Sequence, residues 1–458
     1  MKTIFLPIYN GIRAKNFFRT DVYQSLIKDR DIRLIVTIPS VKLDFYREEF
    51  KDPNVVFVPL DIMSEPWLGR FLSEIAFNSL NTITIRFKQK LEYYKFHKPV
   101  RFAVKKLINF VSRPFPEIRF VLRFLDRFVP LNPEVAAVLE KYQPDLVLAP
   151  DIVFPMDRIF IRAAKRAGYK VVGLTRSWDN LTSKGVIQVL PDKLVLHTER
   201  MKKQAVKLVG MPEKDIYVSG PPDFDDYFKP RKKTREEFLR SLSIDPANRV
   251  VLLSPFYDDY NGSASIIINE VLKAYDQGRF PKDVHFLVRY RPASPEIKEG
   301  LYKSPAVTFT KPCSRFFKVK YKVQMPTKDW EFTAGDVELL VNSISYSDVL
   351  VTTFSTIGID AAACDKPIIG IRYDAEPNTS KIHSILAIAD AHDHYRELER
   401  SGGIKLVYST DELIDAINLL LKNPAEGREG RLEMKRQQIQ FFDGQNGRRA
   451  ADFIKSQI

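Results

Sequence analysis

Short apolar runs alternate with helical patterns along most of the chain. Residues 2–7, 32–38 and 55–58 are apolar and rich in β-branched side chains, which is typical of strands that are buried on both faces of a parallel sheet. Helical patterns separate these runs, and the alternation resumes at residues 145–148 and continues toward the C-terminus. The pattern therefore predicts an α/β fold with parallel, doubly wound sheets.

One segment, residues 84–130, interrupts this alternation. Apolar side chains recur there at the spacing of one helical stripe, namely Val100, Ala103, Val104, Leu107, Ile108 and Val111. A second helix is expected over about residues 116–129, where phenylalanine and leucine are mixed with arginine. The segment therefore predicts two amphipathic helices with basic residues beside an apolar face.

The most informative stretch is residues 347–374. Its apolar, β-branched run at 349–352 predicts a buried strand, and the small apolar residues 357–364 predict a helix packed on a sheet. Pro367 ends that helix, and residues 368–371 form the next predicted strand,.

Ser355 and Thr356 follow the first of these strands directly. In open α/β sheets, ligands bind at the carboxyl ends of strands, where free amides at a helix start favour phosphate. Hydroxyls at 355 and 356 add donors, and Asp360 lies about one helical turn further on, where it could accept hydrogen bonds from ribose. The alternative is an ordinary strand–turn–helix unit in which Ser355 only caps the helix.

This stretch resembles the nucleotide-binding motif of GT-B glycosyltransferases, and more closely that of the CDP-glycerol glycerophosphotransferase branch. The matching residues are Asp348-Val349, Ser355-Thr356 and Asp365-Lys366-Pro367-Ile368-Ile369. Residues 191–227 also resemble the GT-B layout, in which a strand ends in G-x-P-x-[FY]-D at the interdomain linker. That pattern is carried by Gly220, Pro222, Phe224 and Asp225.

The resemblance implies a GT-B-like fold, with two Rossmann-like domains that face an interdomain cleft. We expect residues 1–228 to form an acceptor-binding domain that contains the basic insertion at about 84–130. Residues 229–425 would form the domain that binds the nucleotide donor, and residues 426–458 would be helices that pack back across the domains.

The resemblance also implies a donor site without a metal, in which basic residues neutralise a diphosphate. Arg289 and Arg291 follow the strand predicted at 285–288, and guanidinium groups pair bidentately with phosphate. Related glycerophosphotransferases usually have R-P-H-P here, and Arg291 replaces the histidine, a departure that weighs against a CDP-polyol donor. The predicted nucleotide-binding residues are Arg289, Arg291, Ser355, Thr356 and Asp360.

A polar loop follows the strand predicted at 170–174, where loops on a rigid scaffold carry function. Asp179, with Asp151 as second choice, is the predicted general base that removes the proton of the acceptor hydroxyl,. The other predicted acceptor or cleft residues are Gly11, Arg13, Arg176, Ser177, Trp178, Asn180 and Tyr257. The alternative is a surface loop in which Trp178 covers the core and Asp179 forms a turn.

The net charge of +14 is concentrated between Arg86 and Arg127, where twelve basic residues face three acidic ones. Such a block implies an anionic partner. An anionic membrane is expected; a solvated helical pair or binding of a polyanion are the alternatives, and nucleic acid is not favoured. The predicted contacts are Lys98, Arg101, Lys105, Lys106, Arg119, Arg123 and Arg127.

The two cysteines, Cys313 and Cys364, are too few for a disulfide framework,. The first apolar run is too short for a signal peptide, and the apolar runs of the chain are shorter than the ~18 residues of a spanning helix. No Cys/His spacing indicates a metal site. We therefore expect a cytoplasmic protein, peripheral on the inner face of the cell membrane, with no cofactor and no metal.

The favoured function is transfer of a sugar from a UDP-, CDP- or GDP-linked donor to a cell-surface polysaccharide or lipid-linked acceptor. Three alternatives stay open: a CDP-glycerol-type polyol-phosphate transferase, a UDP-sugar 2-epimerase, and a non-enzymatic protein that binds a polyanion or a membrane.

Overall fold

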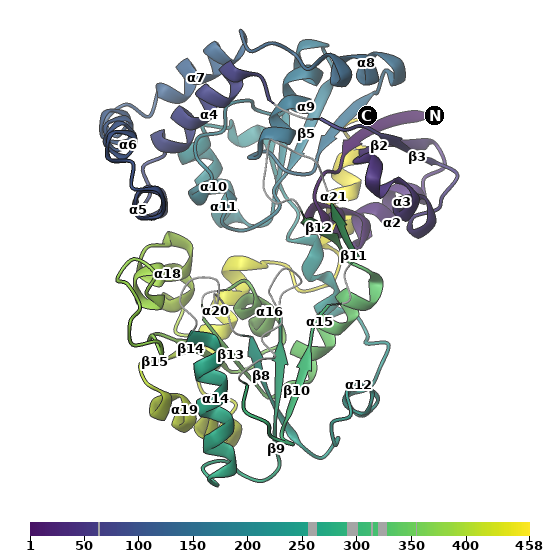
Figure 1. The fold of residues 1–458 in the computed structure, drawn as a ribbon. Helices are drawn as coiled ribbons and strands as arrows, with labels where there is room; N and C mark the ends of the chain where they lie inside the picture. Colours follow the sequence, from purple (N-terminus) through teal and green to yellow (C-terminus); the bar gives the residue numbers. More distant parts are fainter. Residues whose placement is uncertain (63–64, 255–262, 291–300, 313–314, 319–327, 354) are drawn as a thin grey trace. The chain divides into compact units, whose positions relative to one another are not determined.

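The computed structural model describes residues 1–62, 65–254, 263–290, 301–312, 315–318, 328–353 and 355–458 (Figure 1). The chain divides into two compact units. Unit 1 comprises Met1–Asp225, Arg315–Phe332 and Gln440–Ile458, and unit 2 comprises Asp226–Ser314 and Thr333–Ile439. Among the described residues, no helix is long and apolar enough to cross a membrane.

Unit 1 is built on a parallel sheet of seven strands, in the order β3-β2-β1-β4-β5-β6-β7. The strands are β1 (Lys2–Pro7), β2 (Ile32–Ile38), β3 (Val55–Pro59), β4 (Leu146–Ala149), β5 (Lys170–Leu174), β6 (Lys193–Leu196) and β7 (Ile216–Val218). Successive residues of β1 enter two different cores, because side chains alternate across a strand. Phe5 packs on one face of the sheet, whereas Ile4 and Leu6 pack on the other. Both faces of the sheet are buried, which explains why its strands are nearly continuous apolar runs in the sequence.

Helices cover both faces of this sheet. They are α1 (Gly11–Phe18), α2 (Asp21–Ile27), α3 (Leu43–Glu49), α8 (Pro133–Tyr142), α9 (Pro155–Arg166), α10 (Asn180–Ser183), α11 (Glu199–Gln204) and α21 (Asn446–Lys455). Phe160 of α9 joins the core that contains Phe5. Phe17 of α1 and Ile454 of α21 join the core that contains Ile4.

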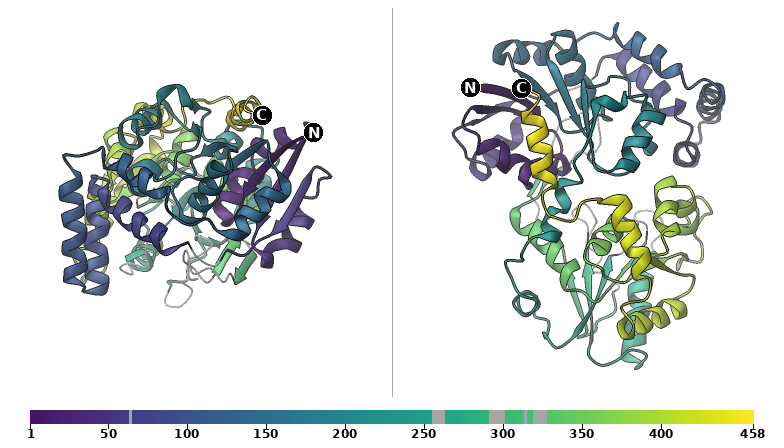
Figure 2. Two further views of the ribbon diagram at one scale, coloured as in Figure 1. Left: turned by 90° about the horizontal axis from the view of Figure 1, so that it is seen from above. Right: turned by 180° about the vertical axis from the view of Figure 1, so that it is seen from behind.

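The insertion consists of α4 (Trp67–Ser79), α5 (Ile83–Phe96), α6 (Pro99–Ser112) and α7 (Ile118–Asp126), and it lies at one edge of unit 1 (Figures 1 and 2). The two predicted helices are confirmed as α6 and α7. The helical region begins earlier than predicted, at Trp67, because α4 packs against both α6 and α7.

A hairpin of β11 (Arg315–Lys318) and β12 (Lys328–Glu331) belongs to unit 1, although the sequence places it within the predicted second domain. The Lys42 Nζ lies 2.5 Å from Asp329 Oδ2 and 2.5 Å from Glu331 Oε1, and all three side chains are buried. A Cβ at Gly11 would lie 1.7 Å from the carbonyl oxygen of Trp330. Glycine is required there because the hairpin backbone covers that turn.

The last helix is fastened to unit 1 by the residues that resemble the linker motif. Asp225 Oδ1 accepts a hydrogen bond of 2.9 Å from the Asn446 amide, and Asp225 Oδ2 accepts one of 2.7 Å from the Gly447 amide. Asp225 therefore caps the start of α21, which packs against α2 (Figure 2). Gly220 has φ +82°, and a Cβ there would meet Asn446 Oδ1 at 2.0 Å.

Unit 2 contains a parallel sheet of six strands in the order β10-β9-β8-β13-β14-β15. Its strands are β8 (Arg249–Ser254), β9 (Val284–Arg289), β10 (Val307–Thr310), β13 (Val349–Thr352), β14 (Ile368–Ile371) and β15 (Ile404–Val407). Its helices include α12 (Arg235–Ser241), α14 (Ser263–Asp276), α15 (Ala334–Tyr346), α16 (Ile357–Ala363), α17 (Ile385–Asp390), α18 (Asp393–Arg400), α19 (Thr410–Lys422) and α20 (Arg428–Gln438). The predicted strand–helix–strand unit is confirmed as β13, α16 and β14.

Candidate functional site

Each sheet reverses its strand order at one point, between β1 and β4 in unit 1 and between β8 and β13 in unit 2. In open parallel sheets, ligands bind outside the carboxyl ends of the strands at such a point. The predicted site residues follow strands beside both reversals.

In unit 1, Arg13 of α1 follows β1 and Asp151 follows β4, and both side chains are buried. The Arg13 Nη2 donates a hydrogen bond of 2.9 Å to Asp157 Oδ2, and the Arg13 Nε lies 3.9 Å from Asp151 Oδ2. One guanidinium therefore faces two carboxylates. We call Arg13, Asp151, Asp157 and Arg176 the Arg13 cluster.

Asp151 is enclosed by partners, two of which belong to the polar loop after β5. Its Oδ1 accepts a hydrogen bond of 2.9 Å from Asn180 Nδ2 and one of 2.8 Å from the Ile152 amide. Its Oδ2 lies 3.7 Å from Arg176 Nε. Because Asp151 has no exposed surface, this geometry suits a residue that positions the loop rather than one that meets an acceptor.

Asp157 is a member of the cluster that sequence reasoning missed. Burial raises the pKa of Asp157 to about 7, opposed by the positive charge of Arg13 and reinforced by the negative charge of Asp151. Its Oδ2 also accepts a hydrogen bond of 3.2 Å from the Phe154 amide at the start of α9. The sequence signal was local: an acid two residues after Pro155, in the first turn of a predicted helix,.

Asp179 lies at the start of α10 and is half-buried. Its Oδ2 accepts a hydrogen bond of 2.6 Å from Ser183 Oγ. The Lys88 Nζ of the insertion donates one of 2.7 Å to the Ser183 carbonyl. Burial lowers the pKa of Lys88 to about 7, with the positive charge of Lys184 also lowering it and the Asp179 carboxylate raising it. Sequence reasoning had counted Lys88 only as part of the basic block.

Cationic groups gather over the ring of Phe154 at the same edge of the sheet. The Arg176 Cζ lies 4.6 Å from the ring centroid, the Arg13 Cζ 5.0 Å and the Lys184 Nζ 5.6 Å. Such contacts hold cations by the ring quadrupole. The predicted neighbour Trp178 is buried, and Ser177 is half-buried.

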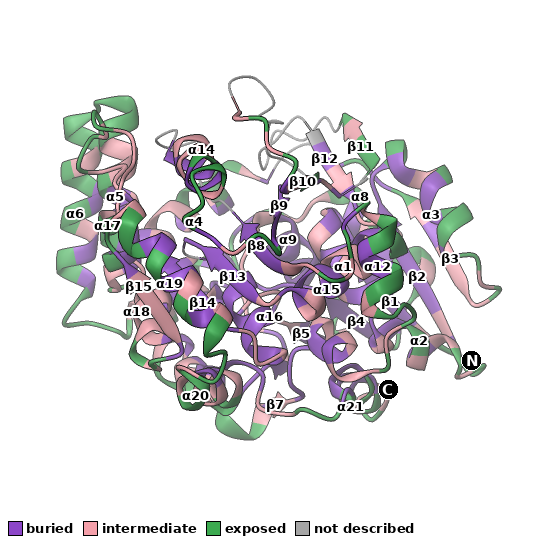
Figure 3. Ribbon diagram, turned by 90° about the horizontal axis from the view of Figure 1, so that it is seen from below, coloured by how far each residue is buried: buried purple, intermediate pink, exposed green. Residues whose placement is uncertain are grey.

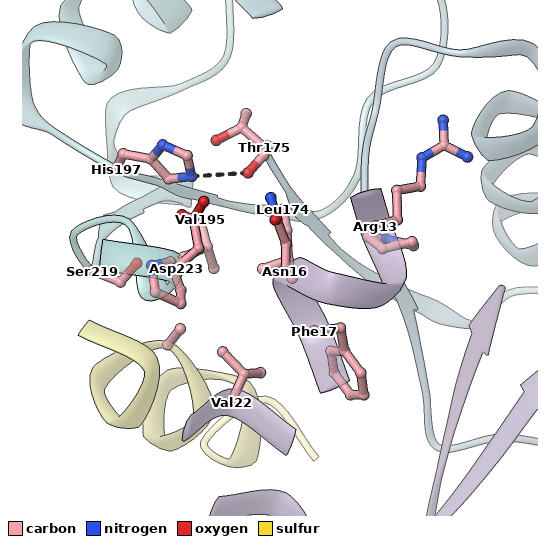
Figure 4. Close-up of a pocket in the computed structure, with 13 residues that line it drawn as sticks. Arg13, Asn16, Phe17, Val22, Leu174, Thr175, Val195, His197, Ser219 and Asp223 are labelled. Carbon is pink, nitrogen blue, oxygen red and sulfur yellow. Dashed lines mark hydrogen bonds between the residues drawn. The ribbon is translucent and has the colours of Figure 1, made fainter. Parts of the chain in front are cut away.

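A small cavity adjoins the cluster, lined by residues that include Arg13, Asn16, Thr175, His197 and Asp223 (Figure 4). The His197 Nε2 lies 2.9 Å from the Thr175 carbonyl, and burial lowers the pKa of His197. The cavity volume is about 30 Å³, which has room for water rather than for a substrate.

In unit 2, Arg289 ends β9 and Asp360 lies on α16, and both side chains are buried. The pKa of Tyr227 is raised well above its ordinary value by burial and next by the negative charge of Asp360, while Arg289 lowers it. Burial lowers the pKa of Arg289, and Tyr227, Asp360 and Asp336 raise it. These mutual effects group Arg289, Asp360 and Tyr227, which we call the Arg289 cluster.

Hydroxyl groups follow β13, beside the reversal of the sheet. Ser355 is buried, and its Oγ accepts a hydrogen bond of 3.4 Å from the Ile357 amide, although the N-cap of α16 is Thr356. Thr356 is exposed. Thr353 was not predicted; it is buried, and its Oγ1 has no hydrogen-bond partner among the residues that the structure describes. Arg291 and Tyr257 lie outside the described residues.

The predicted membrane contacts divide into two groups. Lys98, Lys106 and Arg127 are exposed, and so is Arg101, which also pairs with Glu74 and Glu92. Lys105 is buried and pairs with Glu74 and Glu92. The Arg119 Nη1 donates to the Lys207 carbonyl at 3.0 Å, and Arg123 donates to the carbonyls of Ile187 and Val209. The protein itself therefore engages Arg101, Lys105, Arg119 and Arg123.

Solved structures with the same fold define the class of this protein. The S. aureus MnaA–UDP structure has a TM-score of 0.56 at 14% identity, covering 99% of this chain and 96% of that chain. The structure of UDP-GlcNAc 2-epimerase from Neisseria meningitidis bound to UDP-GlcNAc has a TM-score of 0.55 at 13% identity, covering 100% of both chains. A glycosyltransferase of Rickettsia africae has a TM-score of 0.50 at 12% identity, covering 100% of this chain and 98% of that chain. The fold is therefore of the GT-B type, with two Rossmann-like domains.

Residues 179–456, more than half of the chain, match the sequence model of the family described as CDP-Glycerol:Poly(glycerophosphate) glycerophosphotransferase. The chain belongs to this family, and it is a transferase. No protein with a curated description matches its sequence. The matched region begins at Asp179 and includes the whole Arg289 cluster.

Proposed function

We propose that this transferase takes a group from a nucleotide-activated donor bound by unit 2 and passes it to a hydroxyl group of an acceptor bound by unit 1. The observation that carries the proposal is the Arg289 cluster. It lies within the region that matches the family, and its residues come from β9 and α16, at the carboxyl ends of parallel strands. Such positions favour binding of a nucleotide.

On the donor side, Arg289 would neutralise the diphosphate, because a guanidinium is always charged and pairs bidentately with phosphate oxygens. Ser355 and Thr356 would add hydroxyl donors, and Arg291 would add a second positive charge. Asp360 would accept hydrogen bonds from the ribose. Charge stabilisation of the leaving group would then come from the protein rather than from a metal.

On the acceptor side, Asp179 is the proposed general base. It is partly exposed, and its hydrogen bond from Ser183 fixes the carboxylate. Asp151 would position the loop through Asn180 and Arg176. A base must lie within reach of the proton that it removes, and a half-buried residue meets that requirement better than Asp151, which has no exposed surface.

Two donors are consistent with this arrangement, and different observations favour them. The similar S. aureus and Neisseria structures contain UDP and UDP-GlcNAc, which supports a nucleotide-sugar donor. The family match supports a CDP-polyol donor. As acceptor we propose a cell-surface polysaccharide or a lipid-linked molecule, reached from the cytoplasmic side.

The released nucleotide separates the two donors chemically. Glycosyl transfer breaks the bond between the anomeric carbon and the phosphate oxygen, and it releases a nucleoside diphosphate. Polyol-phosphate transfer breaks the diphosphate linkage, attaches the polyol phosphate to the acceptor oxygen and releases a nucleoside monophosphate. Chromatography of the nucleotide product therefore assigns the donor class.

A thermal-shift screen against UDP, CDP, GDP, ADP and their sugar or polyol conjugates tests the proposal. A ligand that binds only the folded protein raises the midpoint by mass action. We expect the ligands with one particular nucleobase to raise the midpoint, and we expect Arg289→Ala to reduce that shift. Arg279→Ala is the matched control, because Arg279 lies in the same unit and pairs with Asp411 at the surface. Absence of any shift in cooperatively melting protein would contradict the proposal.

A further inference from the structure

Helix α6 presents its apolar side to solvent. Val100, Val104, Leu107, Phe110 and Val111 form an outward stripe, and 76% of Val100, 60% of Leu107 and 73% of Phe110 are exposed. Figure 3 shows α6 as largely exposed along its length. Soluble proteins usually turn such a stripe toward their core, so the polarity of α6 is the reverse of an ordinary surface helix.

The inward side of α6 is polar and satisfied by specific partners. The Asn109 Nδ2 donates hydrogen bonds to the carbonyls of Asn78 and Leu80, and the Ser112 Oγ donates to the Ser79 carbonyl. The buried Lys105 Nζ lies 2.6 Å from Glu74 Oε1. Turning the apolar stripe inward would break these bonds and leave buried polar groups without partners. The contacts on the inner side therefore fix the outward direction of the stripe.

Helix α7 and its flanks carry a second exposed apolar set. Its members are Phe115, Phe120, Val121, Phe124, Leu125 and Phe128, each at least 40% exposed. The other side of α7 is fixed by Asp126, whose two carboxylate oxygens each accept a hydrogen bond of 2.8 Å from Arg162. Monomeric proteins rarely expose contiguous apolar patches beyond a few hundred Å², so two adjacent segments of this kind indicate a binding surface.

The charge around the apolar side chains of α6 and α7 indicates what kind of partner binds this surface. Exposed basic residues of the insertion are Arg86, Lys90, Lys95, Lys98, Arg101, Lys106, Arg113 and Arg127. Basic residues beside exposed aromatic and aliphatic side chains complement a surface with an apolar interior and anionic headgroups. A nucleic acid would complement the charges but not the apolar stripe.

We propose that α6 and α7 dock this protein on an anionic lipid bilayer, with the outward stripe in the acyl boundary and the exposed basic residues at the headgroups. Helix α6 has 14 residues, about 21 Å, which is shorter than the ~30 Å hydrocarbon core. The helix therefore lies in the interface and does not span the bilayer. The buried Lys105 and the engaged Arg123 support the helices from the protein side.

Vesicle co-sedimentation tests this docking. The full chain is mixed with vesicles of phosphatidylcholine alone and with vesicles that also contain about 30% phosphatidylglycerol. We expect binding to the second kind. Leu107→Ser with Phe110→Ser should weaken it at least about tenfold, and Lys106→Glu with Arg113→Glu at least about 30-fold. Two matched controls should bind as the wild type does. Tyr408→Ser changes an aromatic residue of unit 2 that is 56% exposed, and Lys51→Glu changes an exposed residue of unit 1.

Three outcomes would overturn the proposal. One is absence of binding to either vesicle. Another is vesicle binding that the Leu107/Phe110 variant leaves unchanged. The third is self-association of the wild type that this variant abolishes in vesicle-free sedimentation, which would assign the stripe to a second copy of the chain. All of these side chains are exposed, so unchanged thermal melting is expected and verifies that each variant is folded.

Discussion

The two units share a parallel doubly wound topology, but they place different chemistry where their strand order reverses. In unit 1, Arg13 lies within 4 Å of the carboxylates of both Asp151 and Asp157. In unit 2, Arg289 has no carboxylate within that distance among the described residues, and its Nε has no hydrogen-bond partner there. Arg13 is therefore paired with carboxylates of its own unit, whereas the negative charges of Asp360 and Asp336 act on Arg289 from longer range. The comparison teaches that similar positions in the fold can hold arginines in different environments, and it is the basis for our proposal that unit 2 binds the donor.

Asp179→Asn should give the largest effect. Loss of the proposed general base should lower kcat by about 10²- to 10⁴-fold, while the affinity for the nucleotide stays unchanged, because the proposed donor site lies in unit 2. Steady-state kinetics and nucleotide titration measure the two quantities. Asp215→Asn, at a carboxylate that pairs with Lys193 in the same unit, is the matched control. Normal turnover in the Asp179 variant would remove this residue from the chemistry.

Arg289→Ala should weaken binding of the nucleoside diphosphate by about 10- to 100-fold, because hydrogen bonds to charged groups contribute about 1.5–3 kcal/mol. Arg289→Lys should recover little of it, since an ammonium cannot pair bidentately. Calorimetric titration gives both affinities. Equal binding by wild type and Arg289→Ala would show that the uncompensated arginine is not the donor site.

Asp360→Asn should have a smaller effect, about 3- to 10-fold in nucleotide affinity, because the amide keeps one acceptor for a ribose hydroxyl. The same variant should bind a 2′,3′-dideoxynucleotide as the wild type does. If the loss is equally large for the dideoxy ligand, Asp360 does not contact the ribose.

Asp157→Asn should change the pH dependence of stability rather than the affinity. Because the folded-state pKa of Asp157 is about 7, folding is favoured by proton binding. That contribution is complete below about pH 4 and is lost as the pH rises through about 7. Urea unfolding should show that the free energy of unfolding falls less steeply between about pH 5 and about 8 in the variant than in the wild type. Identical slopes would contradict the raised pKa.

Much of the secondary structure could be predicted because its signals are local. The strand–helix–strand unit from β13 to β14 follows from a short β-branched run, small apolar residues and the helix breaker Pro367. The linker motif was also recognised, but not its physical role. Asp225 caps a helix that begins 221 residues later, and no local pattern reveals such a partner.

What the sequence could not reveal depends on distant contacts. The amphipathic pattern of α6 predicts a helix with an apolar side, but its direction is set by partners such as Asn78, which lies 31 residues before Asn109. Lys42 of unit 1 pairs with Asp329 of the β11–β12 hairpin, which lies 287 residues later in the sequence. Asp157 and Lys88 gain their perturbed pKa values from burial, which composition does not report.

Hydrogen–deuterium exchange, with and without the nucleoside diphosphate chosen by the thermal-shift screen, tests the division of roles between the units most directly. The account predicts slower exchange in peptides that cover β9 and the segment from β13 to α16 in unit 2. Peptides that cover β4, β5 and α10 in unit 1 should be unchanged. Protection confined to unit 1 would contradict the account and would place the nucleotide beside the Arg13 cluster instead.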